Sequence, residues 1–134
     1  MKKNICIVVA NYYPKISNAL INGSLRILKE NGLKNYKIIK VPGVFEIPYA
    51  IKKNLKRYDG FIALGCVIKG ETPHFDFISR ASINTLMNLS TSYNKPIGNG
   101  IITCFNKKQA LARSSANNNK GKESAKAIIA LFKI

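Results

Sequence analysis

Acidic residues, histidine and long apolar runs are all scarce in this chain of 134 residues. Six acids face 22 basic residues, which gives a formal net charge of +16, and there is one histidine. No apolar run approaches the roughly 20 residues that cross a bilayer, so we expect no membrane span. What is present, 46% hydrophobic and 9% aromatic residues, is typical of a folded globular protein. We therefore expect one domain over residues 1–134.

The three cysteines, Cys6, Cys66 and Cys104, are odd in number and far apart in the sequence. Each falls in or beside an apolar, strand-like run. This pattern argues against a disulfide framework and against zinc-ligand spacing. Residues 5–10 are also too short an apolar core for a secretory signal. We expect buried free thiols, no metal site and a cytoplasmic protein.

The charge of +16 raises the question of a nucleic-acid partner. However, 12 basic residues precede Ile68 and 10 follow it, so neither half is singled out. No recognition helix, aromatic RNA-stacking motif or basic tail is present. Lysine, isoleucine and asparagine are abundant and share A/T-rich codons, so base composition is sufficient to explain the charge. We expect no nucleic-acid partner.

Strand-like and helix-like segments alternate along the whole chain. We expect an α/β fold, a three-layer α/β/α sandwich around a flavodoxin-like four-stranded parallel sheet in the order 2-1-3-4. The ligand crevice should then join loops 11–14, 42–46 and 68–74. The expected strands cover residues 5–10, 36–41, 61–68 and 97–104. The expected helices cover 15–31, a segment that residues 44–48 lead into and that reaches about residue 57, 73–90, and segments after 106 and 119.

One stretch, residues 61–76, organises the rest of the chain. An apolar strand ends in a polar loop, and Thr72 and Pro73 follow as expected N-cap and first helical residue. The start of this helix, at the carboxyl end of a parallel strand, favours an anion such as phosphate. The single histidine, His74, stands in its first turn. Histidine suits proton transfer near neutral pH, but spacing alone favours an ordinary surface side chain.

Two blocks carry a family resemblance: Val-Pro-Gly-Val-Phe-Glu-Ile-Pro at 41–48 and the stretch from Tyr58 to Asp76, which contains Gly-Glu-Thr-Pro-His. Weaker matches at 100–103, 109–113 and 119–121 follow in the same order. The chain resembles the 6,7-dimethyl-8-ribityllumazine synthase family of riboflavin biosynthesis. The resemblance implies a transferase that condenses 5-amino-6-(D-ribitylamino)uracil with 3,4-dihydroxy-2-butanone 4-phosphate. Phosphate and water are released, without cofactor or metal.

The resemblance also implies roles for individual residues. Without it, Phe45 and the strand end at 66–68 are equally consistent with core residues. Glu46 is then consistent with a carboxylate at a helix start, Thr72 with a plain N-cap, and Arg113 with a solvated charge. Asn99 stands where many relatives carry an aromatic residue, so only backbone contact to the ring is expected there. The implied roles are stacking on the pyrimidine (Tyr12), contact with the ribityl chain and ring (Val44, Phe45, Glu46), reading of the pyrimidine edge (Cys66, Val67, Ile68), phosphate binding (Glu71, Thr72, Arg113), proton transfer (His74) and proximity to substrate (Lys120).

The family forms pentamers or multiples of pentamers with active sites between subunits. By resemblance, residues 99–120 should meet the loops at 12, 44–46 and 66–74 of a neighbouring chain, and riboflavin synthase is a candidate partner. Segment 114–119 is one residue shorter than the commonest family pattern. Two rivals stay open: a flavin-binding flavodoxin-like module, against which loop 11–14 argues because it lacks serine and threonine, and an RNA-binding protein, suggested by charge alone.

Overall fold

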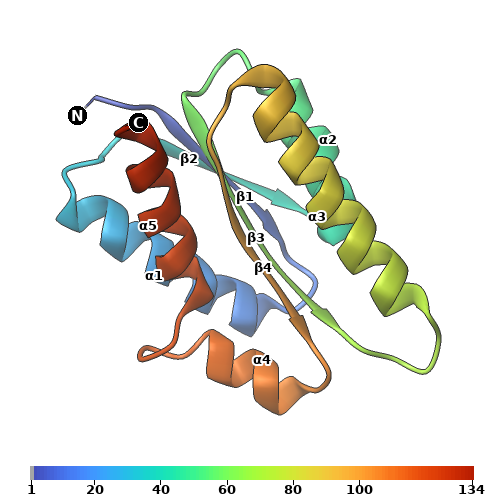
Figure 1. The fold of residues 1–134 in the computed structure, drawn as a ribbon. Coiled ribbons are helices and arrows are strands. Elements are labelled where there is room, and N and C mark those ends of the chain that lie inside the picture. The colour runs from blue at the N-terminus through green and yellow to red at the C-terminus, as the bar shows by residue number, and fades with distance from the viewer. Residues whose placement is uncertain (1) are drawn as a thin grey trace.

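Four parallel strands form one sheet at the centre of the computed structural model, which describes residues 2–134 (Figure 1). Their order is β2-β1-β3-β4, as the alternation of strands and helices predicted. Val8 of β1 lies between Ile39 of β2 and Ala63 of β3, and Ala63 pairs with Asn99 of β4. The strands are β1 (Ile5–Ala10), β2 (Tyr36–Val41), β3 (Gly60–Ile68) and β4 (Ile97–Cys104).

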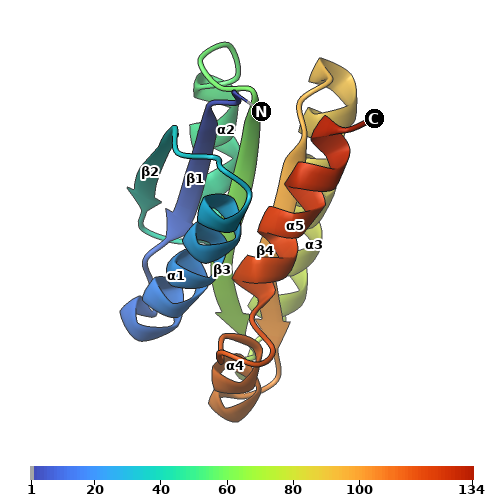
Figure 2. The ribbon, with the colours of Figure 1, turned by 90° about the vertical axis from the view of Figure 1, so that its left-hand side faces the viewer.

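Helices cover both faces of this sheet. Helices α1 (Pro14–Glu30) and α5 (Lys120–Phe132) lie together on one face, and α2 (Ile47–Lys53) and α3 (His74–Tyr93) lie on the other (Figures 1 and 2). The short 3-10 helix η1 (Val44–Glu46) leads into α2. Helix α4 (Lys107–Arg113) lies beyond the carboxyl end of β4 (Figure 2). The three-layer α/β/α prediction is confirmed.

The core is divided by the sheet into two apolar clusters. Along β1, Ile5, Ile7 and Val9 pack toward α1 and α5, while Cys6 and Val8 pack toward α2 and α3. Successive strand residues point to opposite faces, and here both faces are covered. This is why β1 and β3 are continuous apolar runs rather than alternating ones. None of the helices within residues 2–134 has both the length and the apolar character to cross a bilayer.

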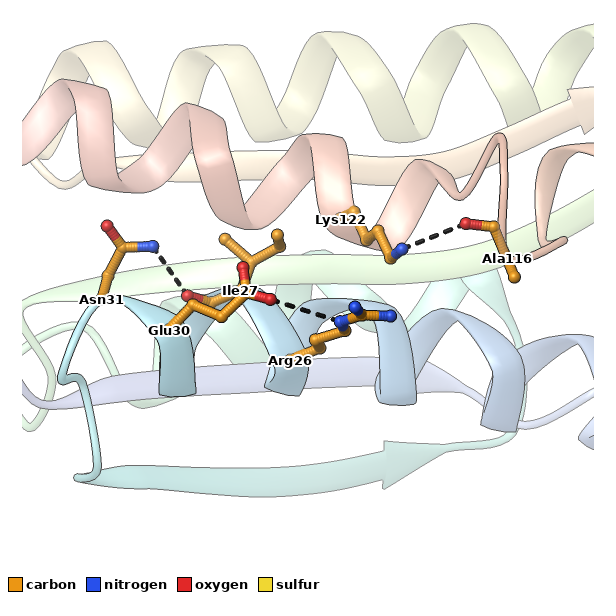
Figure 3. Close-up of polar contacts among 6 residues, drawn as sticks. All are labelled: Arg26, Ile27, Glu30, Asn31, Ala116 and Lys122. Atoms are coloured by element: carbon orange, nitrogen blue, oxygen red, sulfur yellow. Dashed lines mark hydrogen bonds and ion pairs between the residues drawn. The ribbon is translucent and has the colours of Figure 1, made fainter.

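The outer surface of α1 carries the ion pair recorded among the described residues. Arg26 Nε lies 3.3 Å from Glu30 Oε1, with both side chains more than half exposed (Figure 3). An exposed pair one helical turn apart contributes about 0.3–0.5 kcal/mol. The end of the helix is stabilised by Asn31, whose side-chain amide donates to the Ile27 carbonyl at 2.8 Å. The inner surface of α1, which packs on α5, contributes more to stability than this exposed ion pair does.

Three expected helix boundaries were wrong, and one of them is the end of α3, which reaches Tyr93 rather than about residue 90. The helix that residues 44–48 lead into was predicted to reach about Arg57, but α2 ends at Lys53, where the Asn54 side-chain amide donates to the Ala50 carbonyl at 2.7 Å. Helix α3 begins at His74 with Pro73, not Thr72, at the N-cap. Pro73 offers no side-chain acceptor to the first helical amides, and its carbonyl accepts from the Asp76 and Phe77 amides at 3.1 and 3.2 Å.

Candidate active site

A cavity opens at the carboxyl ends of β1, β2 and β3 and has a volume of about 710 Å³. This size is within the range of small-molecule sites. The three loops predicted to converge do so, each contributing a wall. The lining residues are Tyr12, Tyr13, Pro42, Gly43, Val44, Phe45, Glu46, Cys66, Val67, Ile68, His74 and Ile78.

Two exposed aromatic side chains stand at the cavity. Tyr12, just before α1, is 70% exposed, and Phe45, in η1, is 71% exposed. Large apolar side chains normally lose most of this surface in a folded core. Phe45, which its position in the sequence left open between core and ligand contact, is therefore not a core residue. Tyr12 meets Tyr13 edge to face with ring centroids 4.9 Å apart, an arrangement that fixes the loop and leaves the Tyr12 ring available.

The base of the cavity is formed where η1 rests on β3. Val44 is buried at 6% exposure, and it can approach closely because residue 65 is glycine: a Cβ there would lie 2.8 Å from Val44 Cγ2. Cys66 and Val67 are also buried, so they present mainly backbone to the cavity. Glu46 is half-buried and lines the same wall. Its carboxylate can accept hydrogen bonds from hydroxyl groups.

His74 is the first residue of α3 and lines the cavity with an exposed side chain. Its backbone amide makes only a long 3.4 Å contact with Thr72 Oγ1, so the start of the helix retains donor capacity. Glu71 and Thr72 are exposed in the preceding loop, beside the cavity rather than on its lining. The site thus combines a proton-transferring group with an anion-favouring helix start.

Two thiols that are far apart in the sequence meet beneath the cavity. Cys66 of β3 and Cys104 of β4 lie in one apolar cluster, two register positions apart. Burial, followed by the neighbouring Cys104, raises the pKa of the Cys66 thiol to about 12. The pKa of Tyr13 is also raised, mainly by burial and further by the neighbouring Cys66 and Tyr12. Both groups therefore keep their protons at neutral pH, and Cys66 is not a thiolate nucleophile.

Besides Glu71 and Thr72, three further predicted site residues do not line this cavity. Asn99 is exposed on β4, where its Oδ1 accepts a hydrogen bond from the Ile101 amide at 3.0 Å. Arg113, the last residue of α4, donates from Nη1 to Cys104 Sγ at 3.7 Å. Lys120 is half-buried at the first turn of α5. The structure thus brings together the predicted ring and ribityl residues except Asn99, and it leaves Arg113 and Lys120 apart from them as well.

Tyr13, Pro42, Gly43 and Ile78 line the cavity and were missed as site residues from the sequence. Two signals could have found them. Ile78 lies four residues after His74 and so shares its helix face. The other three belong to loops already expected to form the crevice. Within residues 2–134, no three histidine, cysteine or acidic side chains gather into a metal-ligand set.

Known proteins match the chain along almost its whole length. The family model described as 6,7-dimethyl-8-ribityllumazine synthase matches residues 2–134. A 6,7-dimethyl-8-ribityllumazine synthase of Afipia carboxidovorans is 44% identical over 97% of this chain and 84% of the relative. Those of Agrobacterium fabrum and Bartonella bacilliformis are each 42% identical, over 99% and 96% of this chain and 95% and 88% of the relatives. The chain belongs to the 6,7-dimethyl-8-ribityllumazine synthase family.

Proposed function

We propose that the chain condenses 5-amino-6-(D-ribitylamino)uracil with 3,4-dihydroxy-2-butanone 4-phosphate to form 6,7-dimethyl-8-ribityllumazine in riboflavin biosynthesis. One observation carries the proposal beyond family membership. Eight of the residues that the resemblance assigns to substrate binding or catalysis line a single cavity: Tyr12, Val44, Phe45, Glu46, Cys66, Val67, Ile68 and His74.

The ribitylaminouracil is the substrate that suits this lining. The exposed ring of Tyr12 offers a face for stacking on the pyrimidine. Glu46 and the backbone of η1 offer acceptors to the ribityl hydroxyl groups, and the end of β3 offers backbone groups to the pyrimidine edge. The hydroxyl of Tyr13, protonated at neutral pH, adds a donor on the same wall.

The butanone phosphate fits the start of α3. Helix dipole and free backbone amides favour the phosphate there, with Glu71 contributing backbone and Thr72 backbone and hydroxyl. Arg113 supplies a planar guanidinium, which pairs with phosphate through two hydrogen bonds. Lys120 adds a second positive charge near the substrate, and Asn99 contributes backbone to the ring system. These assignments follow the family motifs.

The chemistry needs mainly alignment of the two substrates. The 5-amino group of the uracil attacks the ketone and water leaves to give an imine. Phosphate departs by elimination, and the ribityl-bearing nitrogen closes the ring with loss of a second water. Holding two reactants in register supplies about 7–11 kcal/mol in favourable cases. His74 shuttles protons, while Arg113 and the start of α3 stabilise the departing phosphate.

We also propose a cytoplasmic single-domain protein that assembles as a pentamer or a multiple of pentamers. A second chain would explain why Asn99, Arg113 and Lys120 lie off the cavity, since they would complete the site of a neighbour. The outer surface of α3 supports this, because Phe77 and Met87 are 69% and 63% exposed on it. Exposed apolar side chains on one helix favour a protein interface. Riboflavin synthase is a candidate partner of the assembly.

The direct test is to mix the protein with both substrates and follow lumazine absorbance. We expect product to form faster than in a protein-free mixture, with release of one phosphate per lumazine. The His74→Ala variant is the matched control for a contaminating activity. No acceleration by the wild-type protein would overturn the proposal.

Native mass measurement on the same sample determines the assembly. Filter binding to single-stranded RNA at rising salt tests the charge-based alternative, since phosphate contacts give a steep salt dependence. We expect no RNA binding at physiological salt.

A further inference from the structure

Asn119 is a buried asparagine whose side chain joins three helices. It is 7% exposed and lies immediately before α5. Its Nδ2 donates to the Ala19 carbonyl of α1 and to the Ser114 carbonyl at the end of α4, both at 3.0 Å. Its Oδ1 accepts from the Lys122 amide at 3.1 Å. Both amide protons and the oxygen are thus satisfied, as a buried polar group requires.

The surrounding backbone is shaped to hold this side chain. A Cβ at Gly23, in the middle of α1, would overlap the Asn119 carboxamide, whereas one at Gly121 would first overlap the Leu20 carbonyl of α1 and then meet Asn119 Oδ1. Glycine inside a helix is destabilising relative to alanine. An asparagine that served only to cap α5 would need the bond to Lys122 alone. The space at Gly23 and the two bonds outside α5 therefore indicate a role beyond capping.

The two cationic residues assigned to substrate flank this side chain in sequence. Ser114, whose carbonyl Asn119 holds, directly follows Arg113, and Lys120 directly follows Asn119. The Asn119–Ser114 bond closes the loop over residues 114–119. Lys122 reinforces the closure by donating from Nζ to the Ala116 carbonyl at 3.0 Å (Figure 3). This loop is the segment that is shorter than the common family pattern.

Helix α4 is short, with seven residues, and one of its residues, Ala110, is buried. Ser114, which follows the last residue, is buried, and its hydroxyl donates to the Ala110 carbonyl at 2.9 Å, so this bond holds Ser114 to α4 itself and not to α1. On one side Arg113 contacts Cys104 of β4 at 3.7 Å, a weak sulfur acceptor. On the other side the Asn119 amide ties Ser114 to α1. Loss of that tie releases the end of α4, and a mobile guanidinium loses affinity because ordering it is unfavourable.

We infer that Asn119 is a positioning residue for phosphate binding, which fixes Arg113 and Lys120 relative to each other by joining the end of α4, the start of α5 and α1. The inference rests on the proposed function, and it assigns to Asn119 the geometry of the phosphate-binding side chains. It holds whether Arg113 completes the site of its own chain or of a neighbour, because the three bonds lie within one chain.

The variant Asn119→Ser tests the inference, because serine still caps α5 but is too short to reach Ala19 and Ser114. We expect the KM for butanone phosphate to rise about tenfold. The KM for ribitylaminouracil should stay within about twofold of the wild-type value. Ser24→Ala is the matched control, since it removes a buried 2.8 Å bond between α1 and the Gly121 carbonyl without touching α4. It should lower thermal stability and leave both KM values unchanged.

A double-mutant cycle separates positioning from general stability. If Asn119 acts through Arg113, Asn119→Ser should add little to the KM increase of Arg113→Ala. Full additivity, equal increases in both KM values, or the same KM change in Ser24→Ala would overturn the inference. Should Asn119→Ser fail to fold, Gly23→Ala displaces the same side chain from α1 and is expected to raise the same KM.

A measurement without turnover distinguishes failure of this inference from failure of the proposed function. Inorganic phosphate is titrated calorimetrically into the wild-type protein, Asn119→Ser and Ser24→Ala. We expect the phosphate Kd to rise about tenfold in Asn119→Ser only. An unchanged Kd would overturn the positioning role even if lumazine forms. Absence of lumazine formation with this Kd difference intact would overturn the proposed reaction alone.

Discussion

The loops that line the cavity and the segment from α4 to α5 are both assigned to substrate, but they are built differently. The loops at Tyr12, Val44–Glu46 and His74 meet within one chain, since each follows a strand of the same sheet edge. Helix α4 and the loop that leads to the start of α5 (residues 107–119) lie beyond the carboxyl end of β4 and do not reach the cavity lining (Figure 2). The parallel sheet alone brings the first region together, whereas the second depends on side-chain ties and, as we propose, on a neighbouring chain.

This difference predicts that the two regions can be damaged separately. Changes in the cavity should affect turnover and the ribitylaminouracil, whereas changes in the α4–α5 segment should affect the phosphate substrate. Loss of the assembly should affect both regions at once.

The largest effect is expected from separating the subunits. Met87→Glu places a charge on the exposed apolar surface of α3, 13 residues from His74. We expect native mass to shift from pentamer to monomer and lumazine formation to fall about a hundredfold or more. Tyr36→Glu, at an exposed aromatic residue of β2, is the control and should retain the assembly. A fully active Met87→Glu monomer would refute the inter-subunit site.

The next effect is on proton transfer in the cavity. His74→Ala should lower kcat by about ten- to a hundredfold, at or below the lower end of general acid–base contributions, because alignment supplies most of the rate. The KM for butanone phosphate should change little. Steady-state kinetics with each substrate varied in turn provides the measurement. An unchanged kcat would remove His74 from the mechanism.

Arg113→Ala tests the other region. We expect the KM for butanone phosphate to rise about thirtyfold, since a charge-assisted hydrogen bond is worth about 1.5–3 kcal/mol. The KM for ribitylaminouracil should be unaffected. Lys108→Ala removes an exposed cation of the same helix and is the matched control. Equal losses in the two variants would indicate a general charge effect rather than a phosphate contact.

Alkaline stability tests the buried thiols of the sheet that both regions share. Burial raises the pKa of Cys6 to about 12 from 9.0, with Lys37 opposing, and Cys66 rises to about 12 as well. Above pH 9 the unfolded thiols lose protons while the folded ones keep them. The free energy of unfolding therefore falls as pH rises toward 12, by about 1.4 kcal/mol per pH unit for each thiol. Cys6→Ala should make this slope shallower in denaturant titrations at pH 9–11, and an identical slope would contradict the assignment.

The smallest effect is expected where the two regions touch, at the contact between Arg113 of α4 and Cys104 of β4. Cys104→Ala removes the sulfur that Arg113 contacts, and we expect a two- to fourfold rise in the butanone-phosphate KM. Cys6→Ala is matched in residue type, strand location and complete burial, but its side chain faces α2 and α3. It should leave that KM unchanged. A similar rise in both variants would show that core packing, not the Arg113 contact, is responsible.

Much of the fold could be predicted from the chain, because strands covered on both faces must be continuous apolar runs. The apolar runs at 5–10 and 61–68 are strands in the structure, as is the less continuous segment 97–104, and the predicted order 2-1-3-4 is confirmed. Helix ends were less predictable. Asn54 ends α2 through its bond to Ala50, and Pro73 replaces Thr72 as the N-cap of α3. Both outcomes depend on local side-chain geometry that periodicity does not contain.

The predicted site divides in the same way. Tyr12, the 44–46 segment and His74 each follow a predicted strand, so topology alone placed them at one cavity. Tyr13 was missed because an aromatic residue beside another gives no periodic signal. The meeting of Cys66 and Cys104 was also unforeseen, since it depends on the register of β3 against β4. The individual roles of the predicted site residues in binding and catalysis stay predictions.

The sequence by itself determined the layered architecture, the sheet edge that carries the site, and the family, because apolar patterning and contiguous motifs are local properties of the chain. The tertiary structure alone decided that Phe45 is exposed, that two distant thiols touch, and that Asn119 joins α1 to the end of α4 across 100 residues. These features are contacts between segments far apart in the chain. They depend on close packing and on how each buried polar group finds its partner, which one-dimensional patterns do not encode.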